Sequence, residues 1–276
     1  MATDASALPA LLGLVKSGKV IDLSVPLAED LPSTWPTHMP FQRKLFNYFK
    51  DQPALGQPLS GSRGPYHTAV LTIDEHAGTH VDAPAHFIPP PGSGLPNAAE
   101  IGSVTVEQLA LTDLIGPAAV IDVTALTDTG GPGISPEITP KHITDWEAKY
   151  GQLQPGEIVL FRSDWDKHYV RGPEGSKYAF DSVVLKSGPG WPSPGVPTLE
   201  LLFNRGIKTI GLDGASVGSS HDGVPPHVWG LGRGMIYVEL LANLNQLPPR
   251  GALFAFLPLK IQGGSAAPGR GIAIIP

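Results

Sequence analysis

The protein has 276 residues, no cysteine and a formal net charge of −6. This length can bury a large core without disulfides, and the missing cysteine excludes thiol catalysis, thiolate metal ligands and disulfide bonds. The acidic balance gives no electrostatic footprint for nucleic acid, and no apolar run is long enough to predict a membrane span, so we expect neither partner.

The first predicted element is a short amphipathic helix near the N-terminus. Leu8, Leu11, Leu12 and Val15 recur at helical spacing, which places them on one face. Asp4 stands where a secretory signal peptide carries positive charge, so we do not interpret this segment as a leader. Together with the lack of cysteine, this favours a soluble cytoplasmic protein.

Short apolar runs bounded by Gly, Pro, Asp or Asn predict strands further along the chain. These runs lie at 19–27, 68–76, 117–124, 157–165, 207–214, 234–241 and 252–261. Helical patterns lie between some of them, at 105–111, 139–151 and 197–206. The second helix has the clearest ends, because Thr139 suits an N-cap, Pro140 suits the first turn and Gly151 suits the stop.

The elements together predict a mixed α/β fold with several β-only stretches rather than a regular βαβ alternation. We find no internal repeat and no linker, so we expect a single domain over 1–276. The 33 glycines and 30 prolines indicate many loops. The longest predicted loops, 46–66 and 170–196, are candidates for binding loops.

The stretch HAGTHVDAPAHF at 76–87 holds an unusual concentration of metal-ligand side chains. His76, His80, Asp82 and His86 occupy even positions, which an ideal strand would place on one face. An extended chain would separate the first and last of them by about 33 Å, so a shared site requires the chain to double back.

Two residues allow this reversal. Gly78 permits unusual backbone angles, and Pro84 fixes a bend while it disfavours a helix. A helical histidine pair at i and i+4 is the alternative geometry. Glycine and threonine between the two histidines weaken that alternative.

The chemistry of this cluster predicts a divalent metal site. Imidazoles and a carboxylate suit Zn²⁺, Mn²⁺ or Fe²⁺, and two histidines with one carboxylate leave coordination positions open for water. Such a site can lower the pKa of bound water towards about 7. His86 is one ligand too many, so it is a candidate acid/base that moves protons.

A second cluster lies far along the chain, where His221 and His227 precede Glu239. Glu239 stands inside the apolar run GMIYVELLANL, where a carboxylate must face a solvent-exposed edge or act as a ligand. Both clusters therefore predict one shared site. The remaining histidines are predicted to be structural or surface residues: His38, His67, His142 and His168.

HAGTHVDAPAHF resembles the H-x-G-T-H-x-D-x-P-x-H signature of the cyclase family of metal-dependent hydrolases, and every fixed position is present. That family includes bacterial kynurenine formamidases, isatin hydrolases and related lactone hydrolases. Further similar segments run over most of the chain: VIDLSVPL, TWPTHMPF, VLFRSDW, GIKTIGLDGASV, MIYVELLANLNQLPPRG and LPLKIQGGSAAPGR.

The resemblance implies a swivelling β/β/α fold, with a β-barrel-like core and flanking helices, in a homodimer or higher oligomer. It implies His76, His80 and Asp82 as ligands of a first metal and His86 as the general acid/base. In the formamidase branch, Asp82 would bridge to a second metal held by a histidine and a glutamate twelve residues apart. The pair with this spacing is His227 and Glu239. Some relatives work with one manganese, so the resemblance implies one or two ions, Mn²⁺ or Zn²⁺.

The resemblance also assigns a substrate-binding role to Trp35, which matches the tryptophan of a W-P-G-D-type loop near the substrate. Core packing is the alternative role for this side chain. His221 is the other residue that we assign to substrate binding. The chain departs from the family by reading WPTH in this loop, and the 46–66 insertion is a second departure. Both disfavour N-formylkynurenine as the substrate.

We therefore expect a metal-dependent hydrolase that cleaves a small amide, lactam or lactone by metal-activated water. N-formylkynurenine formamidase is the alternative within the family. An Fe(II) oxygenase with a two-histidine, one-carboxylate triad is the alternative enzyme class. A metal that only stabilises a loop-rich fold is the non-catalytic alternative.

Overall fold

The computed structural model describes residues 13, 16, 18–49 and 66–276. The amphipathic helix predicted from Leu8, Leu11, Leu12 and Val15 lies outside these residues.

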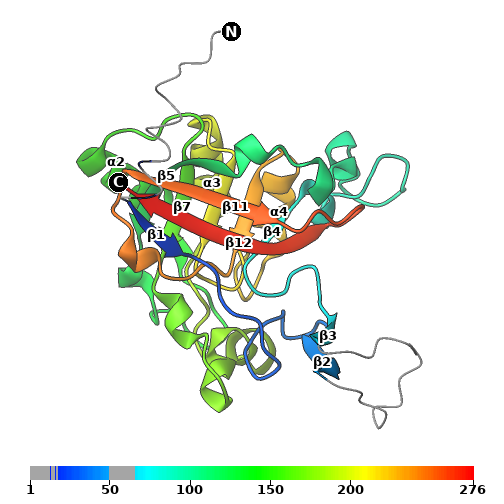
Figure 1. Ribbon diagram of the computed structural model, residues 1–276. Coiled ribbons are helices and arrows are strands. Elements are labelled where there is room, and N and C mark those ends of the chain that lie inside the picture. The colour runs from blue at the N-terminus through cyan, green and yellow to red at the C-terminus, as the bar shows by residue number, and fades with distance from the viewer. Residues whose placement is uncertain (1–12, 14–15, 17, 50–65) are drawn as a thin grey trace.

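An eight-stranded sheet forms the centre of the described structure (Figure 1). In spatial order its strands are β1 (Lys19–Asp22), β12 (Ala266–Ile275), β11 (Ala252–Pro258), β5 (Ile115–Asp122), β7 (Ile158–Arg162), β9 (Thr209–Leu212), β10 (Ile236–Glu239) and β4 (His80–Asp82). The first residues of β12 also pair with β4, so the strands from β12 to β4 close into a barrel. The last residues of β12 pair with β1 on the rim. The expected barrel-like core is confirmed.

The central strand β7 is apolar and buried from Ile158 to Phe161, as expected of a strand with both faces covered. On β7, Ile158 and Leu160 belong to the cluster that fills one side of the sheet. The alternate residues Val159 and Phe161 belong to the cluster on the other side. This period of two is the ordinary alternation of a strand.

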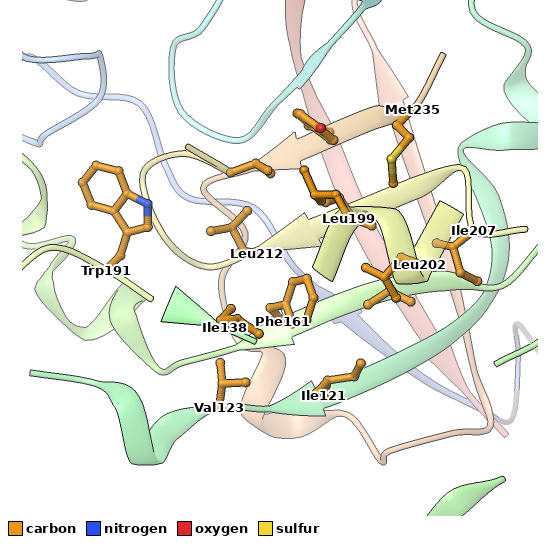
Figure 2. Packing of buried hydrophobic residues seen from close by; sticks show 14 of the residues in the cluster. Ile121, Val123, Ile138, Phe161, Trp191, Leu199, Leu202, Ile207, Leu212 and Met235 are labelled. Atoms are coloured by element: carbon orange, nitrogen blue, oxygen red, sulfur yellow. The ribbon is translucent and has the colours of Figure 1, made fainter. Parts of the chain in front are cut away.

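Helices cover the outer side of the sheet. They are α2 (Pro140–Tyr150), α3 (Val196–Asn204) and α4 (Val224–Leu231). Figure 2 shows the packing of Leu199 and Leu202 from α3 with Phe161 and Leu212 from the sheet. The predicted start of α2 is confirmed, because the Thr139 side chain and the His142 side chain form a reciprocal capping box.

The predicted helix at 105–111 is wrong. The chain forms two short 3₁₀ turns instead, Val106–Gln108 and Leu111–Asp113. Leu109, between them, has an extended backbone. Seven residues are too few for an α-helix to be stable by itself, and the Val106 amide is held by the carbonyl of Gly264.

The predicted strand at 68–76 does not join the barrel. It forms β3 (His67–Thr72), which pairs with β2 (Gln42–Tyr48) in a separate two-stranded sheet beside the main body (Figure 1). The segment 170–196, predicted as a loop, contains a 3₁₀ segment at Pro173–Tyr178 and a π-helical turn at Asp181–Leu185. It ends in β8 (Ser193–Pro194), which pairs with β6 (Glu137–Ile138).

Candidate metal centre

The chain reverses within the HAGTHVDAPAHF stretch, as the site requires. Gly78 has a φ of +61°, a conformation that glycine adopts readily. Its N–H donates to the Ser33 carbonyl, and the Thr79 hydroxyl donates to the Leu240 carbonyl at 2.6 Å. After β4, Pro84 begins a single 3₁₀ turn that ends at His86. His76 and His86 are thereby brought together, with ring centroids 4.2 Å apart.

The pairing of β4 with β10 brings the two predicted clusters together. His80 lies directly opposite Glu239 in the antiparallel register, and Val81 lies opposite Val238. Both valines belong to the cluster inside the barrel. Residues directly opposite on one face are close neighbours, so His80, Asp82 and Glu239 share the other face of the sheet. Glu239 is 4% exposed, which excludes the solvent-exposed edge.

Three histidines are held in the same orientation around this face. Nδ1 of His80 lies 2.8 Å from the Gly78 carbonyl oxygen, and Nδ1 of His227 lies 2.6 Å from the Gly223 carbonyl oxygen. Nδ1 of His76 lies 3.3 Å from an oxygen of Asp74. An acceptor at Nδ1 fixes the proton there, which leaves the Nε2 lone pair free.

All three Nε2 atoms point to Asp82. Its Oδ1 lies 3.6 Å from Nε2 of His76 and 3.4 Å from Nε2 of His80. Its Oδ2 lies 3.8 Å from Nε2 of His227. One oxygen of Asp82 therefore faces His76 and His80, and the other faces His227.

Glu239 faces His80 with one carboxylate oxygen and His227 with the other. Its Oε2 lies 3.4 Å from Nε2 of His80, and its Oε1 lies 3.6 Å from Nε2 of His227. Oε1 also accepts hydrogen bonds from the Val217 amide at 2.6 Å and the Ser216 hydroxyl at 3.2 Å. These donors fix the carboxylate, so Oε2 is its freer oxygen.

The polar atoms at the centre fit a cation. Among the described residues, Nε2 of His80 and both carboxylate oxygens of Asp82 are buried without a hydrogen-bond partner. Lone pairs facing a buried carboxylate are costly unless a positive charge lies between them. Burial opposes a charge on His80, yet Asp82 and Glu239 raise its imidazole pKa to about 10. A divalent ion bound between these residues would supply this positive charge.

His86 lies beside the cluster in a different orientation. Its Nδ1 lies 3.1 Å from Nε2 of His76, and its ring packs 5.8 Å from that of His227. Burial lowers the pKa of the His86 imidazole to about 4, although the charge of Asp82 acts in the opposite direction. Its neutral form, which can accept a proton, is therefore the stable one near pH 7.

A pocket of about 310 Å³ opens onto these residues. Its walls are largely apolar and include Trp35, which stands edge-on to the buried ring of Trp191. Trp35 thus both packs against the core and faces the pocket. His221 also lines the pocket, and its Nδ1 accepts a hydrogen bond from the Ser135 amide at 3.3 Å. Its Nε2 therefore carries the proton and is a donor.

His38 was predicted to be structural or surface, but it lines the same pocket. The signal that could have identified it is its position three residues after Trp35 in the WPTH loop. The other histidines set aside are not among the pocket-lining residues. His67 contacts Arg43 on the β2–β3 sheet, and His142 caps α2.

A closed barrel with a buried histidine–carboxylate cluster beside a pocket is the arrangement of a candidate metal-dependent active site. The family model named Cyclase, described as "Putative cyclase", matches residues 21–219. The chain belongs to this family, as the signature in HAGTHVDAPAHF predicted.

Similar proteins agree with this membership. The isatin hydrolase of Roseibium aggregatum is 31% identical over 211 residues, covering 75% of this chain and 74% of the relative. The kynurenine formamidase of Salinibacter ruber is 32% identical over 210 residues, covering 73% and 77%. The solved isatin hydrolase A of Ralstonia solanacearum has a TM-score of 0.77 and 27% identity, with full coverage of both chains.

Proposed function

We propose that this protein is a metal-dependent hydrolase of small amides, lactams or lactones. One observation carries the proposal: three imidazole lone pairs converge on buried Asp82, with His86 beside them, next to a pocket. The relatives named isatin hydrolase and kynurenine formamidase support the same reaction class.

The first metal would be held by His76, His80 and Asp82, and a second by His227 and Glu239 together with Asp82. The freer oxygen of Glu239 also faces His80, and His80, Asp82 and Glu239 form one of the groups that could hold an ion. A divalent ion bound there would lower the pKa of a coordinated water and polarise the substrate carbonyl. The mixed nitrogen and oxygen donors suit Zn²⁺ or Mn²⁺. The two faces of Asp82 support two ions rather than one.

His86 would move the protons of the reaction. The ring would accept a proton from the attacking water and pass it to the departing nitrogen or oxygen of the substrate. Burial keeps His86 neutral at the start of the reaction, because it lowers the pKa of the imidazole to about 4. His227 is kept from this role by its stacking on Phe87 and its bond to the Gly223 carbonyl.

The pocket supports a substrate with a flat apolar part. Trp35, Phe87 and Tyr178 supply aromatic walls, and His221 supplies a hydrogen-bond donor. We therefore place isatin and related lactams first among test substrates, since relatives by sequence and by structure are named isatin hydrolases. N-formylkynurenine is the second candidate, supported by the relatives named kynurenine formamidases.

The two other function classes explain fewer of the residues at this site. An Fe(II) oxygenase triad would use two histidines and one carboxylate, and would leave the His86 contact with His76 and the buried Glu239 without roles. A purely structural ion tends to be enclosed by its ligands, whereas His76, His80, His227 and Glu239 all line the pocket.

We further propose that the working form is a homodimer or higher homo-oligomer that acts on a small-molecule substrate. The β2–β3 sheet supports self-association, because Val70 and Leu71 are 50% and 53% exposed there. A two-stranded sheet is marginally stable without further packing.

Among the described residues, no helix is long and apolar enough to span a bilayer.

The test is hydrolysis of isatin and N-formylkynurenine under nitrogen by protein stripped with a chelator and then reloaded with Zn²⁺ or Mn²⁺. We expect the stripped protein to be inactive and reloaded protein to open the lactam or release formate. Activity that survives stripping, or that requires oxygen, would contradict the proposal.

A further inference from the structure

His38 stands at the pocket without a role in the chemistry described above. Its side chain is 39% exposed and lines the pocket. Its ring stands edge-on to His76, with centroids 5.9 Å apart. His38 and the candidate metal ligand His76 therefore lie side by side in the lining of the same pocket.

Asp74 connects His38 to the metal centre. Oδ1 of Asp74 accepts the His76 backbone N–H at 2.8 Å and lies 3.3 Å from Nδ1 of the same residue. Oδ2 of Asp74 lies 3.4 Å from Nδ1 of His38. One carboxylate therefore contacts a metal-ligand candidate with one oxygen and a pocket residue with the other.

The contact with Asp74 fixes the tautomer of the His38 ring. A nitrogen lone pair facing a carboxylate oxygen would be repelled, so Nδ1 of His38 carries its proton on that side. Nε2 is the polar atom that remains for a ligand. In the neutral ring it is an acceptor, whereas Nε2 of His221 is a donor because its Nδ1 accepts from Ser135.

We propose that His38 is a specificity-determining residue, held by Asp74, that binds a hydrogen-bonding N–H group of the substrate next to the scissile carbonyl. Nε2 of His38 accepts this N–H while Nε2 of His221 donates to an oxygen of the same ligand. The substrate class that satisfies both is an aromatic secondary amide or lactam with a free N–H. This inference rests on the proposed function.

The first experiment measures binding without turnover. Isatin, which has a ring N–H, and N-methylisatin, which lacks it, are titrated into metal-free wild-type, His38→Phe and His38→Gln proteins by calorimetry. We expect wild type to bind isatin about tenfold more tightly than N-methylisatin, the size of one hydrogen bond. The His38→Phe variant should lose this preference, and His38→Gln, whose amide oxygen can accept, should recover part of it.

The controls separate a binding role from a structural one. His67→Phe removes a histidine outside the pocket lining and should behave as wild type. Metal content of reloaded His38→Phe should equal that of wild type, because His38 is not a proposed ligand. In metal-free protein, ¹⁵N NMR should show the Nδ1–H tautomer of His38, and Asp74→Asn should shift this tautomer.

The outcomes are distinct. An isatin preference that His38→Phe retains, or equal loss in His67→Phe, would overturn the role of His38. Failure of wild-type protein to bind isatin, or to prefer it over N-methylisatin, would overturn it as well. An isatin preference that depends on His38, in a protein that turns over neither proposed substrate, would support the inference while it contradicts the proposed function.

Discussion

At the scale of single residues, the orientation of each imidazole decides what this site can do. His80 and His227 give their Nδ1 protons to backbone carbonyls, so their Nε2 lone pairs face the buried carboxylates. His86 is not fixed in this way, and its Nδ1 faces the cluster instead. With His76, whose Nδ1 faces Asp74, three histidines have the orientation that the proposed ligand role requires, and His86 has a different one.

Replacement of His86 by alanine tests this division of roles. We expect the variant to retain its metal and to lose about 100-fold or more in kcat, the usual contribution of general acid/base catalysis. Elemental analysis and steady-state kinetics measure the two quantities on the same sample, with His67→Ala as the control. Loss of metal together with activity would assign His86 to the ligands.

The reversal of the chain at Gly78 gives a prediction for stability. An alanine Cβ there would lie 2.6 Å from Cδ2 of Leu27, in a backbone with φ of +61°. Gly92 has a φ of +80° with no atom within 4 Å of such a Cβ, so it is a matched control. We expect Gly92→Ala to lower the free energy of unfolding by about 1 kcal/mol and Gly78→Ala by clearly more. Equal losses in urea unfolding would show that the contact with Leu27 is unimportant.

Much of the site could be predicted from the sequence at this scale. HAGTHVDAPAHF concentrates ligand-type side chains so strongly that a shared site for His76, His80 and Asp82 was predicted without a structure, and the fold brings the three together. Glu239 was singled out because a carboxylate in an apolar run must face an exposed edge or act as a ligand, and it is buried. His38 was missed because its partner, Asp74, lies 36 residues away and only the fold makes them neighbours.

At the scale of secondary structure elements, the strands that carry apolar runs were predicted, including β10 with Glu239, whereas β4 and β12 were not. β7 and β9 are apolar on both faces, which the sequence shows directly. β4 has only three residues, two of them polar, and β12 contains glycine, proline and arginine. Pairing across the barrel stabilises both strands, and the local sequence pattern of each strand does not indicate that pairing.

The junction of β7 and β9 gives a pH-dependent prediction. Asp213 accepts hydrogen bonds from the backbone amides of Ser163 and Asp164 at 2.9 and 2.8 Å. Burial nevertheless raises the pKa of its carboxyl from the ordinary 3.8 to about 7. Between these values the folded protein keeps a proton that the unfolded chain has released. The contribution of Asp213 to stability is therefore present below about pH 4 and is lost as the pH rises through about 7.

Urea unfolding of wild type and Asp213→Asn from pH 4 to 8 measures this contribution. The difference between them should change by up to about 1.4 kcal/mol per pH unit, with wild type losing stability relative to the variant as the pH rises. All other titrating groups cancel in the comparison. A constant difference over this range would show that Asp213 is ionised throughout.

At the scale of the whole molecule, the metal centre joins parts of the chain that are distant in sequence. Residues from β4, β10 and α4 meet there, and all three contribute to the packed core. A bound ion should therefore stabilise the fold without being required for it. We expect metal-free protein to remain folded, with a Tm about 5–10 °C lower that recovers on reloading. Unfolding on metal removal would instead support the purely structural alternative.

The most direct test of the central claim is the metal content per chain of gently purified protein, measured by elemental analysis for wild type, His80→Ala and Glu239→Gln. We expect about two zinc or manganese ions in wild type, about one in Glu239→Gln, and a severe loss in His80→Ala, because Nε2 of His80 faces both Asp82 and Glu239. Wild-type protein that contains no metal and takes none up on reloading would contradict it.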